Sequence, residues 1–215
     1  MATDRDFTFR AVFLDALGTL VELEAPWRYL RPVVPPEVPE QRLVGAVRAE
    51  MAYYKEHAHE GRDSESLAGL RERCAALLSD RLGTEISVSQ LLGSLRFRAY
   101  PDSAPALARL RERGLKTVVV SNWDCSLPAV LDRVGLGAWL DGAVSSAQAG
   151  ARKPDPAIFE PALELAGVQP GEVVHVGDTV EEDVAAARAA GIEVLLLDRG
   201  GRGDIASLGE IVKHL

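Results

Sequence analysis

Short apolar segments recur along the chain, each bounded by polar or turn-forming residues, and they predict buried strands. Several are almost continuously apolar instead of alternating, which is typical of strands buried on both faces of a parallel sheet. The segments are AVFLD (11–15), KTVVVSN (116–122), GAVSS (142–146), EVVHVGD (172–178) and EVLLLD (193–198). We therefore expect a parallel sheet built from these segments.

Amphipathic helices are predicted between the strand segments. Their apolar residues recur at helical spacing, and glycines follow their ends. One helix is predicted to begin at Asp155, an N-cap residue followed by Pro156 at the first helical position. The predicted helices span 103–113, 126–134, 155–167 and 181–190. Strands that alternate with helices in this way predict an α/β fold with helices on both faces of the sheet.

One interval breaks the alternation. Residues 23–96 begin with a proline-rich stretch and then show helical periodicity, with no convincing strand before Phe97. Leu43, Val47, Met51 and Tyr54 share one helical face, and a second apolar face begins at Leu67. We expect an inserted helical cap at 23–96 and a core domain formed by 1–22 and 97–215, with the Tyr53-Tyr54 pair packed inside the cap.

Composition narrows the range of partners and compartments. The formal net charge of −8 argues against general affinity for nucleic acid or anionic membranes. The two cysteines, Cys74 and Cys125, have neither metal-binding nor disulfide spacing, which is typical of a reduced compartment. The polar first ten residues do not resemble a signal peptide, and no apolar stretch is long enough to span a membrane. The expectation is a cytoplasmic protein.

Residues with reactive or binding side chains follow the carboxyl ends of the predicted strands, where ligands bind in open α/β sheets. They are Asp15 with Thr19, Ser121 with Asn122, Lys153, and Asp178 with Asp183. A carboxylate at a strand end can act as a nucleophile, and hydroxyls, turn amides and a lysine can bind an anion beside it. Three carboxylates form an all-oxygen site of the kind that Mg²⁺ prefers.

These segments resemble the motifs of the haloacid dehalogenase superfamily. DALGT resembles the first motif, SNWD the second, RKPDP the third and GDTVEED the fourth, and all four occur in the family's order. The resemblance covers essentially the whole chain and carries a helical cap inserted after the first strand. It implies a three-layer, Rossmann-like sheet of strand order 5-4-1-2-3, in which Asp15, Ser121 and Asp178 come together.

The resemblance also implies a function and a set of roles. The expected activity is Mg²⁺-dependent hydrolysis of a small phosphorylated metabolite through an aspartyl-phosphate on Asp15. Thr19 is expected to assist catalysis, and Ser121, Asn122 and Lys153 to bind the transferring group. Asp15, the Leu17 carbonyl and Asp178 would hold Mg²⁺, with Asp183 in support.

Several side chains near these motifs have secondary interpretations. In capped relatives the loop between the cap helices faces the site, so Arg62 is expected to contact the far end of an anionic substrate. Asp124 is expected to shape the turn after its strand. His175 is interpreted as a hydrogen-bonded core residue. The resemblance is compatible with a monomer or a homodimer.

Leu17 departs from the family's phosphatases, which carry there a second aspartate that protonates the leaving group and activates water. Such acid–base catalysis is worth about 10²–10⁴ in rate. A 2-haloacid dehalogenase also lacks that aspartate, but the family's dehalogenases use no metal and their fourth motif differs from GDTVEED. Phosphonate-cleaving relatives use a cap lysine, for which Lys55 is the only candidate. A relative that binds an anion without turnover is the remaining alternative.

Overall fold

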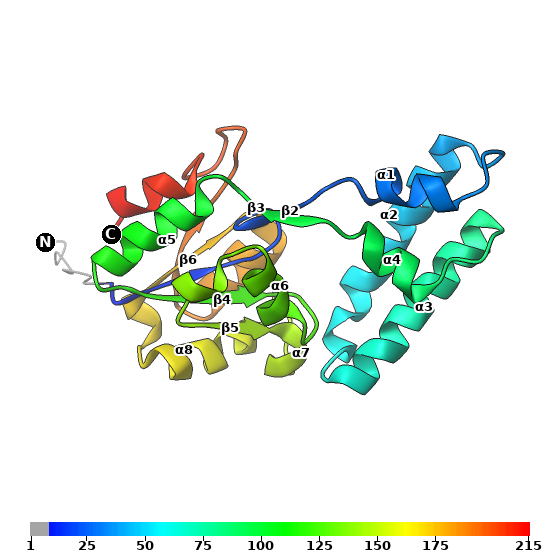
Figure 1. Ribbon diagram of the computed structural model, residues 1–215. Coiled ribbons are helices and arrows are strands. Elements are labelled where there is room, and N and C mark those ends of the chain that lie inside the picture. Colours follow the sequence, from blue (N-terminus) through cyan, green and yellow to red (C-terminus); the bar gives the residue numbers. More distant parts are fainter. Residues whose placement is uncertain (1–8) are drawn as a thin grey trace, which may run out of the picture.

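The computed structural model describes residues 9–215, and a five-stranded parallel sheet lies in one of its two lobes (Figure 1). The strands are β1 (Ala11–Leu14), β4 (Lys116–Ser121), β5 (Gly142–Ser145), β6 (Val173–Gly177) and β7 (Glu193–Leu196). They lie in the order β5-β4-β1-β6-β7, and all neighbours are parallel. Counted from β7, this is the predicted order 5-4-1-2-3, so the Rossmann-like α/β fold is confirmed.

Both faces of the sheet are buried, which explains the nearly continuous apolar strands. Val12 and Leu14 of β1 pack into one core cluster, whereas Ala11 and Phe13 point to the opposite face and pack into another. The helices that contribute to these clusters are α5 (Ser103–Glu112) and α6 (Leu127–Arg133) on one face, and α8 (Glu160–Ala166) and α9 (Ala185–Ala189) on the other. Shorter elements are α7 (Ser146–Ala149), η3 (Gly137–Trp139), η5 (Pro170–Glu172) and η7 (Leu208–Lys213).

Two predicted helices begin irregularly. Asp155 accepts a hydrogen bond from the Ala157 amide and caps the 3₁₀ turn η4 (Pro156–Phe159), which leads into α8. The helix predicted over 181–190 instead opens with a π-helical turn, η6 (Val180–Val184), before α9. Such turns widen a helix and often occur at functional sites. Here the turn contains Asp183, whose carboxylate accepts a hydrogen bond from the Thr179 amide.

Residues 26–94 form a separate group of helices, called here the helical unit (Figure 1, blue to green). Its elements are α1 (Pro26–Leu30), η1 (Arg31–Val33), α2 (Glu40–His57), η2 (Ala58–Glu60), α3 (Ser64–Leu82) and α4 (Val88–Ser94). The unit has its own apolar cluster, in which Leu43 and Val47 of α2 meet Leu70 and Leu78 of α3. Within residues 9–215, no helix combines the length and apolarity that crossing a membrane requires.

A two-stranded ribbon joins the helical unit to the sheet (Figure 1). Strand β2 (Val21–Leu23) pairs antiparallel with β3 (Phe97–Ala99). The expectation that no strand precedes Phe97 is therefore wrong at β2. That strand has only three residues, too few for a clear apolar pattern, and it exists because it pairs with a partner far along the chain. Residues 1–8, which belong to the predicted core domain, lie outside the described residues.

Candidate active site

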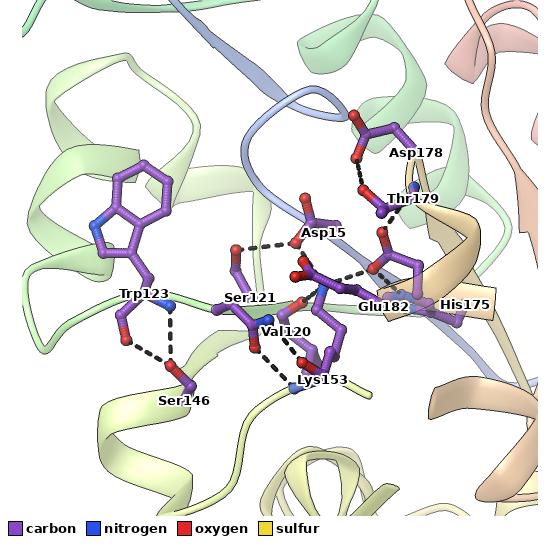
Figure 2. Close-up of polar contacts among 12 residues, drawn as sticks. Asp15, Val120, Ser121, Trp123, Ser146, Lys153, His175, Asp178, Thr179 and Glu182 are labelled. Atoms are coloured by element: carbon purple, nitrogen blue, oxygen red, sulfur yellow. Dashed lines mark hydrogen bonds and ion pairs between the residues drawn. The ribbon is translucent and has the colours of Figure 1, made fainter. Parts of the chain in front are cut away.

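The candidate site lies at the carboxyl ends of β1, β4 and β6 (Figure 2). Leu14 of β1 is in register with Val119 of β4 and with Val176 of β6. Residues that follow these positions therefore emerge at one edge of the sheet. They are Asp15 after β1, Ser121 at the end of β4, and Asp178 after β6.

A buried lysine connects the predicted site residues. The Lys153 side chain is 1% exposed, and its Nζ donates to Asp15 Oδ1 at 2.6 Å, Asp183 Oδ1 at 2.5 Å and the Val120 carbonyl at 3.1 Å. These three acceptors use the full donor capacity of the ammonium group. Ser121 Oγ donates to the same Asp15 oxygen at 2.9 Å. The second oxygen, Asp15 Oδ2, accepts no hydrogen bond from any residue that the structure describes.

The charges within this cluster shift one another's pKa values. Burial alone would lower the pKa of Lys153, but the adjacent Asp15 and Asp183 carboxylates hold it above its ordinary value. Burial would raise the pKa of Asp183, but Lys153 and a hydrogen bond from His175 together hold it well below its usual range. Burial raises the pKa of Asp15, and contact with Lys153 offsets part of that rise. Lys153 is thus held in its charged form.

Asn122 fixes the backbone of Lys153. Its Oδ1 accepts a hydrogen bond from the Lys153 amide at 2.8 Å, and its Nδ2 donates to the Lys153 carbonyl at 3.0 Å. Both ends of the Asn122 amide are therefore engaged within the protein. Substrate binding by Asn122 stays a prediction, but positioning of the lysine is visible directly.

Asp183 is fully enclosed and fully hydrogen bonded. Its Oδ1 accepts from Lys153 and from His175 Nε2, the latter at 2.9 Å, and its Oδ2 accepts from the Thr179 amide at 3.1 Å. Gly177 allows this close approach, because a Cβ at that position would lie 2.1 Å from Asp183 Cγ. His175 is buried and hydrogen bonded, which confirms its interpretation as a hydrogen-bonded core residue.

Asp178 lies at the more exposed side of the cluster. Its Oδ1 accepts from Thr179 Oγ1 at 3.2 Å, and its pKa is raised to about 6 because neighbouring protein displaces water and because Asp15 and Asp183 repel a further negative charge. The turn after Asp15 packs directly against this carboxylate. Gly18 has a φ of 89°, and a Cβ there would lie 2.1 Å from Asp178 Oδ2. Glycine is therefore required at position 18 both for its conformation and for space.

Asp15, Asp178 and Asp183 could together hold a metal ion. Each offers an oxygen, and these oxygens lie within 4.8 Å of one another. A set of carboxylate oxygens suits Mg²⁺ or Ca²⁺. Asp15 Oδ2 and Asp178 are the freer ligands, since hydrogen bonds already engage both oxygens of Asp183.

Other predicted residues lie apart from this hydrogen-bonded cluster. Leu17 is 40% exposed, so an apolar side chain occupies the position of the missing acid. Thr19 is fully buried, and its Oγ1 has no hydrogen-bond partner among the described residues. Arg62 is exposed, and within residues 9–215 its side chain makes no hydrogen bond or ion pair with the cluster. Lys55 forms an ion pair with Glu182 at 3.0 Å and is 57% exposed.

The sequence reasoning missed one residue that supports the site. Arg199 donates to the Thr19 carbonyl at 2.9 Å and forms an ion pair with Asp102, while its guanidinium stacks 3.8 Å from the centre of the Tyr100 ring. It thereby ties the turn after Asp15 to the end of β3. A contact between residues 180 positions apart leaves no local signal in the sequence.

Curated relatives match part of the chain. The chain is 46% identical over 87 residues to a haloacid dehalogenase-like hydrolase domain-containing protein 3 from Bos taurus. That match covers 40% of this chain and 35% of the bovine protein. It is 34% identical over 114 residues to a glyceraldehyde 3-phosphate phosphatase from Methanopyrus kandleri. That match covers 50% of this chain and 47% of the phosphatase. The chain thus spans about half the length, or less, of these curated relatives.

Structural similarity extends further along the chain. An L-2-haloacid dehalogenase from Xanthobacter autotrophicus superposes with a TM-score of 0.73 at 24% identity, covering 95% of this chain and 97% of that one. At this identity the likeness shows the fold alone. The family profile described as haloacid dehalogenase-like hydrolase matches residues 9–191. The chain therefore belongs to the haloacid dehalogenase-like hydrolases.

Proposed function

We propose that this hydrolase is a Mg²⁺-dependent phosphatase that acts on a small phosphate ester through an aspartyl-phosphate on Asp15. The observation that carries the proposal is the trio of carboxylates beside one buried lysine. Asp15, Asp178 and Asp183 leave two negative charges that Lys153 does not compensate. A divalent cation would balance them, and when bound it would also offset the charge of the substrate's phosphoryl oxygens.

The roles of the protein's own groups follow from their contacts. Lys153 and Ser121 both bind Asp15 Oδ1, so they orient the carboxylate and leave Oδ2 as the nucleophilic oxygen. Attack of Oδ2 on phosphorus forms the acyl phosphate of Asp15 while the bond to the leaving group breaks and the leaving group departs. Lys153 supplies positive charge where charge develops in the transition state. Water then hydrolyses the acyl phosphate, which releases inorganic phosphate and restores the Asp15 carboxylate.

Leu17 restricts the substrates that this scheme accommodates. An apolar side chain cannot protonate a departing alkoxide, so phosphates with acidic leaving groups, such as acyl or aryl phosphates, are favoured over alkyl phosphates. Leu17 also cannot activate the hydrolytic water. The second step should therefore be slow, and phosphorylated Asp15 should accumulate.

Leu17 also favours a second candidate, 2-haloacid dehalogenase activity, since a halide leaves without a proton. That reaction would use Asp15 as the nucleophile on carbon and would need no metal. The net negative charge of Asp15, Asp178 and Asp183 beside one lysine argues against it, because without a metal it would repel the carboxylate of a 2-haloacid. The half-exposed Lys55, paired with Glu182, offers little support for a Schiff base and hence for phosphonate cleavage.

A turnover screen tests the proposal. The protein is assayed with aryl and alkyl phosphates and with 2-haloacids, with Mg²⁺ or with a chelator, and Asp15→Asn serves as the control. We expect phosphate release that requires Mg²⁺ and is lost in Asp15→Asn. Halide release that persists with the chelator would establish the dehalogenase instead. Phosphate binding without turnover of any substrate would establish an anion-binding relative.

A further inference from the structure

Three consecutive residues of α2 contact residues of the core domain. Each of these core residues lies close in sequence to a site residue, namely Ser121, Lys153 or Asp183. The contacts are Tyr54 Oη to Asp124 Oδ2 at 2.7 Å, Lys55 Nζ to Glu182 Oε1 at 3.0 Å, and the Glu56 carbonyl to Arg152 Nη1 at 3.3 Å. The end of α2 is therefore seated on three segments that build the site.

Tyr54–Asp124 is the strongest of these contacts. Asp124 is only 3% exposed, and its carboxylate accepts hydrogen bonds from the Tyr54 hydroxyl and, at 2.6 Å, from the Ser126 amide. A buried carboxylate depends on such bonds. Burial and the adjacent Asp124 raise the pKa of Tyr54 well above its ordinary value, so the hydroxyl stays protonated and donates. Lys55 is largely exposed, and exposed ion pairs contribute little.

A backbone contact reinforces this pair. The Cys125 amide donates to the Gly61 carbonyl at 2.8 Å, so the turn after η2 packs against the loop after β4. Glycine permits the approach, because a Cβ on Gly61 would lie 2.9 Å from Asp124 Cβ. Tyr54 packs against the apolar cluster of the helical unit, as predicted, and its hydroxyl also joins that unit to Asp124 of the core.

The loop that carries Asp124 also carries anion-site residues. Ser121 donates to Asp15, and Asn122 holds the backbone of Lys153 with two hydrogen bonds. An anion bound beside Asp15 would restrict this loop and hence the position of Asp124. Coupling of this kind is reciprocal, so a fixed Asp124 would also favour the bound anion.

We propose that Tyr54 and Asp124 are positioning residues that latch the helical unit onto the core when an anion occupies the site. This inference rests on the proposed function and on the expectation that the helical unit is a cap over the substrate. The latch links closure of the cap to occupancy of the site beside Asp15, and it acts through the loop after β4 without contacting the reacting atoms.

Amide hydrogen exchange across residues 54–63 tests the latch without requiring turnover. Exchange is measured with and without inorganic phosphate in the presence of Mg²⁺, for the wild type, Tyr54→Phe and Tyr53→Phe. Tyr53 is the matched control, because its hydroxyl accepts from Arg73 within the helical unit. We expect phosphate to slow exchange about tenfold in the wild type and Tyr53→Phe, and less than about twofold in Tyr54→Phe, since a hydrogen bond to a charged group is lost.

The phosphate-dependent change, and not the absolute exchange rate, is the deciding quantity. A purely structural role of Tyr54 would alter exchange equally with and without phosphate. The latch is refuted if Tyr54→Phe responds to phosphate as the wild type does, or if the wild type does not respond. If Tyr54→Phe fails to fold, Asp124→Ala replaces it, because it removes the oxygen that accepts from Tyr54; a full phosphate response in that variant refutes the latch equally.

The outcomes for the latch and for the phosphatase are separable. A protein that releases no phosphate from any ester but shows the Tyr54-dependent exchange response refutes the phosphatase and supports the latch. A protein that hydrolyses phosphate esters while Tyr54→Phe keeps the full response supports the phosphatase and refutes the latch.

Discussion

The two halves of the site differ in how completely their charges are satisfied. The inner half comprises Lys153, Asp183, His175 and the Oδ1 oxygen of Asp15, all buried and joined by hydrogen bonds. The outer half comprises Leu17, Gly18, Asp178 and the Oδ2 oxygen of Asp15. The side chains of Leu17 and Asp178 are exposed. The inner half is already stable as an ion cluster. The outer half has negative charge and an apolar side chain but no cation.

This difference separates structural roles from chemical ones. A group whose hydrogen-bonding capacity is used within the protein can orient its neighbours, but it has little left to offer a ligand. Asp183 is such a group, whereas Asp178 and Asp15 Oδ2 remain available. Substitutions in the inner half should therefore affect folding and activity together, and substitutions in the outer half should affect activity with little loss of stability.

The largest effect is expected from removal of the inner cation. Lys153→Met leaves Asp15 and Asp183 buried without their shared partner, so the free energy of unfolding should fall by about 3–5 kcal/mol and turnover should disappear. Urea unfolding measures the first and phosphate release the second. Lys213→Met is the control, because that lysine is 68% exposed and should contribute little. A loss of stability below about 1 kcal/mol would contradict the description of the inner half.

In the outer half, Asp178→Asn should reduce activity without loss of stability. Phosphate release at limiting Mg²⁺ should fall about a hundredfold, since a ligand of the cation is lost. Stability of the metal-free protein at pH 8 should rise by about 0.5–1 kcal/mol, because repulsion from Asp15 and Asp183 is relieved in a partly screened position. Glu181→Gln, at the adjacent exposed turn, should change neither quantity. Destabilisation by Asp178→Asn would show that Asp178 belongs to the structural half.

Because the pKa of Asp178 is raised, the stability difference between the wild type and Asp178→Asn should depend on pH. Folding raises that pKa from 3.8 to about 6, so the folded protein binds the proton more tightly than the unfolded chain does. The contribution of Asp178 to stability should therefore increase as the pH falls from 7 through 6 towards 4. Unfolding curves of metal-free wild type and Asp178→Asn, recorded over this range, should converge at low pH. Parallel curves would exclude Asp178 as the group responsible.

The sequence predicts the inner half better than the connections around it. Asp15, Ser121, Lys153 and Asp183 meet because each follows a strand end or begins a helix, and parallel strands bring those ends to one edge. The bonds from His175 to Asp183, Arg199 to Thr19 and Tyr54 to Asp124 depend on side-chain packing between distant segments. Strand β2 likewise depends on its partner. The periodicity of apolar residues predicts which residues are buried, but it does not predict which buried side chains contact one another.

Leu17→Asp adds the missing acid to the outer half. We expect steady-state phosphate release to rise about tenfold, less than the roughly 10²–10⁴ that acid–base catalysis can supply, because the new carboxylate also repels Asp178. The wild type should show a burst of leaving group equal to the enzyme concentration, and this burst should vanish in Leu17→Asp as hydrolysis of the Asp15 acyl phosphate accelerates. Leu17→Asn, polar but not acidic, should behave as the wild type does. If Leu17→Asp is inactive but folded, Leu17 itself assists the reaction.

The smallest expected effect is a thermal shift caused by the cation alone. Mg²⁺ at about ten times its dissociation constant should stabilise the wild type by about 1.4 kcal/mol, or about 3–5 °C in Tm. The shift should be absent in Asp178→Asn and retained in Glu181→Gln. Because hydrogen bonds within the protein already engage both oxygens of Asp183, the inner half should add little to this shift. A full shift in Asp178→Asn would mean that the cation binds elsewhere, and the unsatisfied charge of the outer half would then need another explanation.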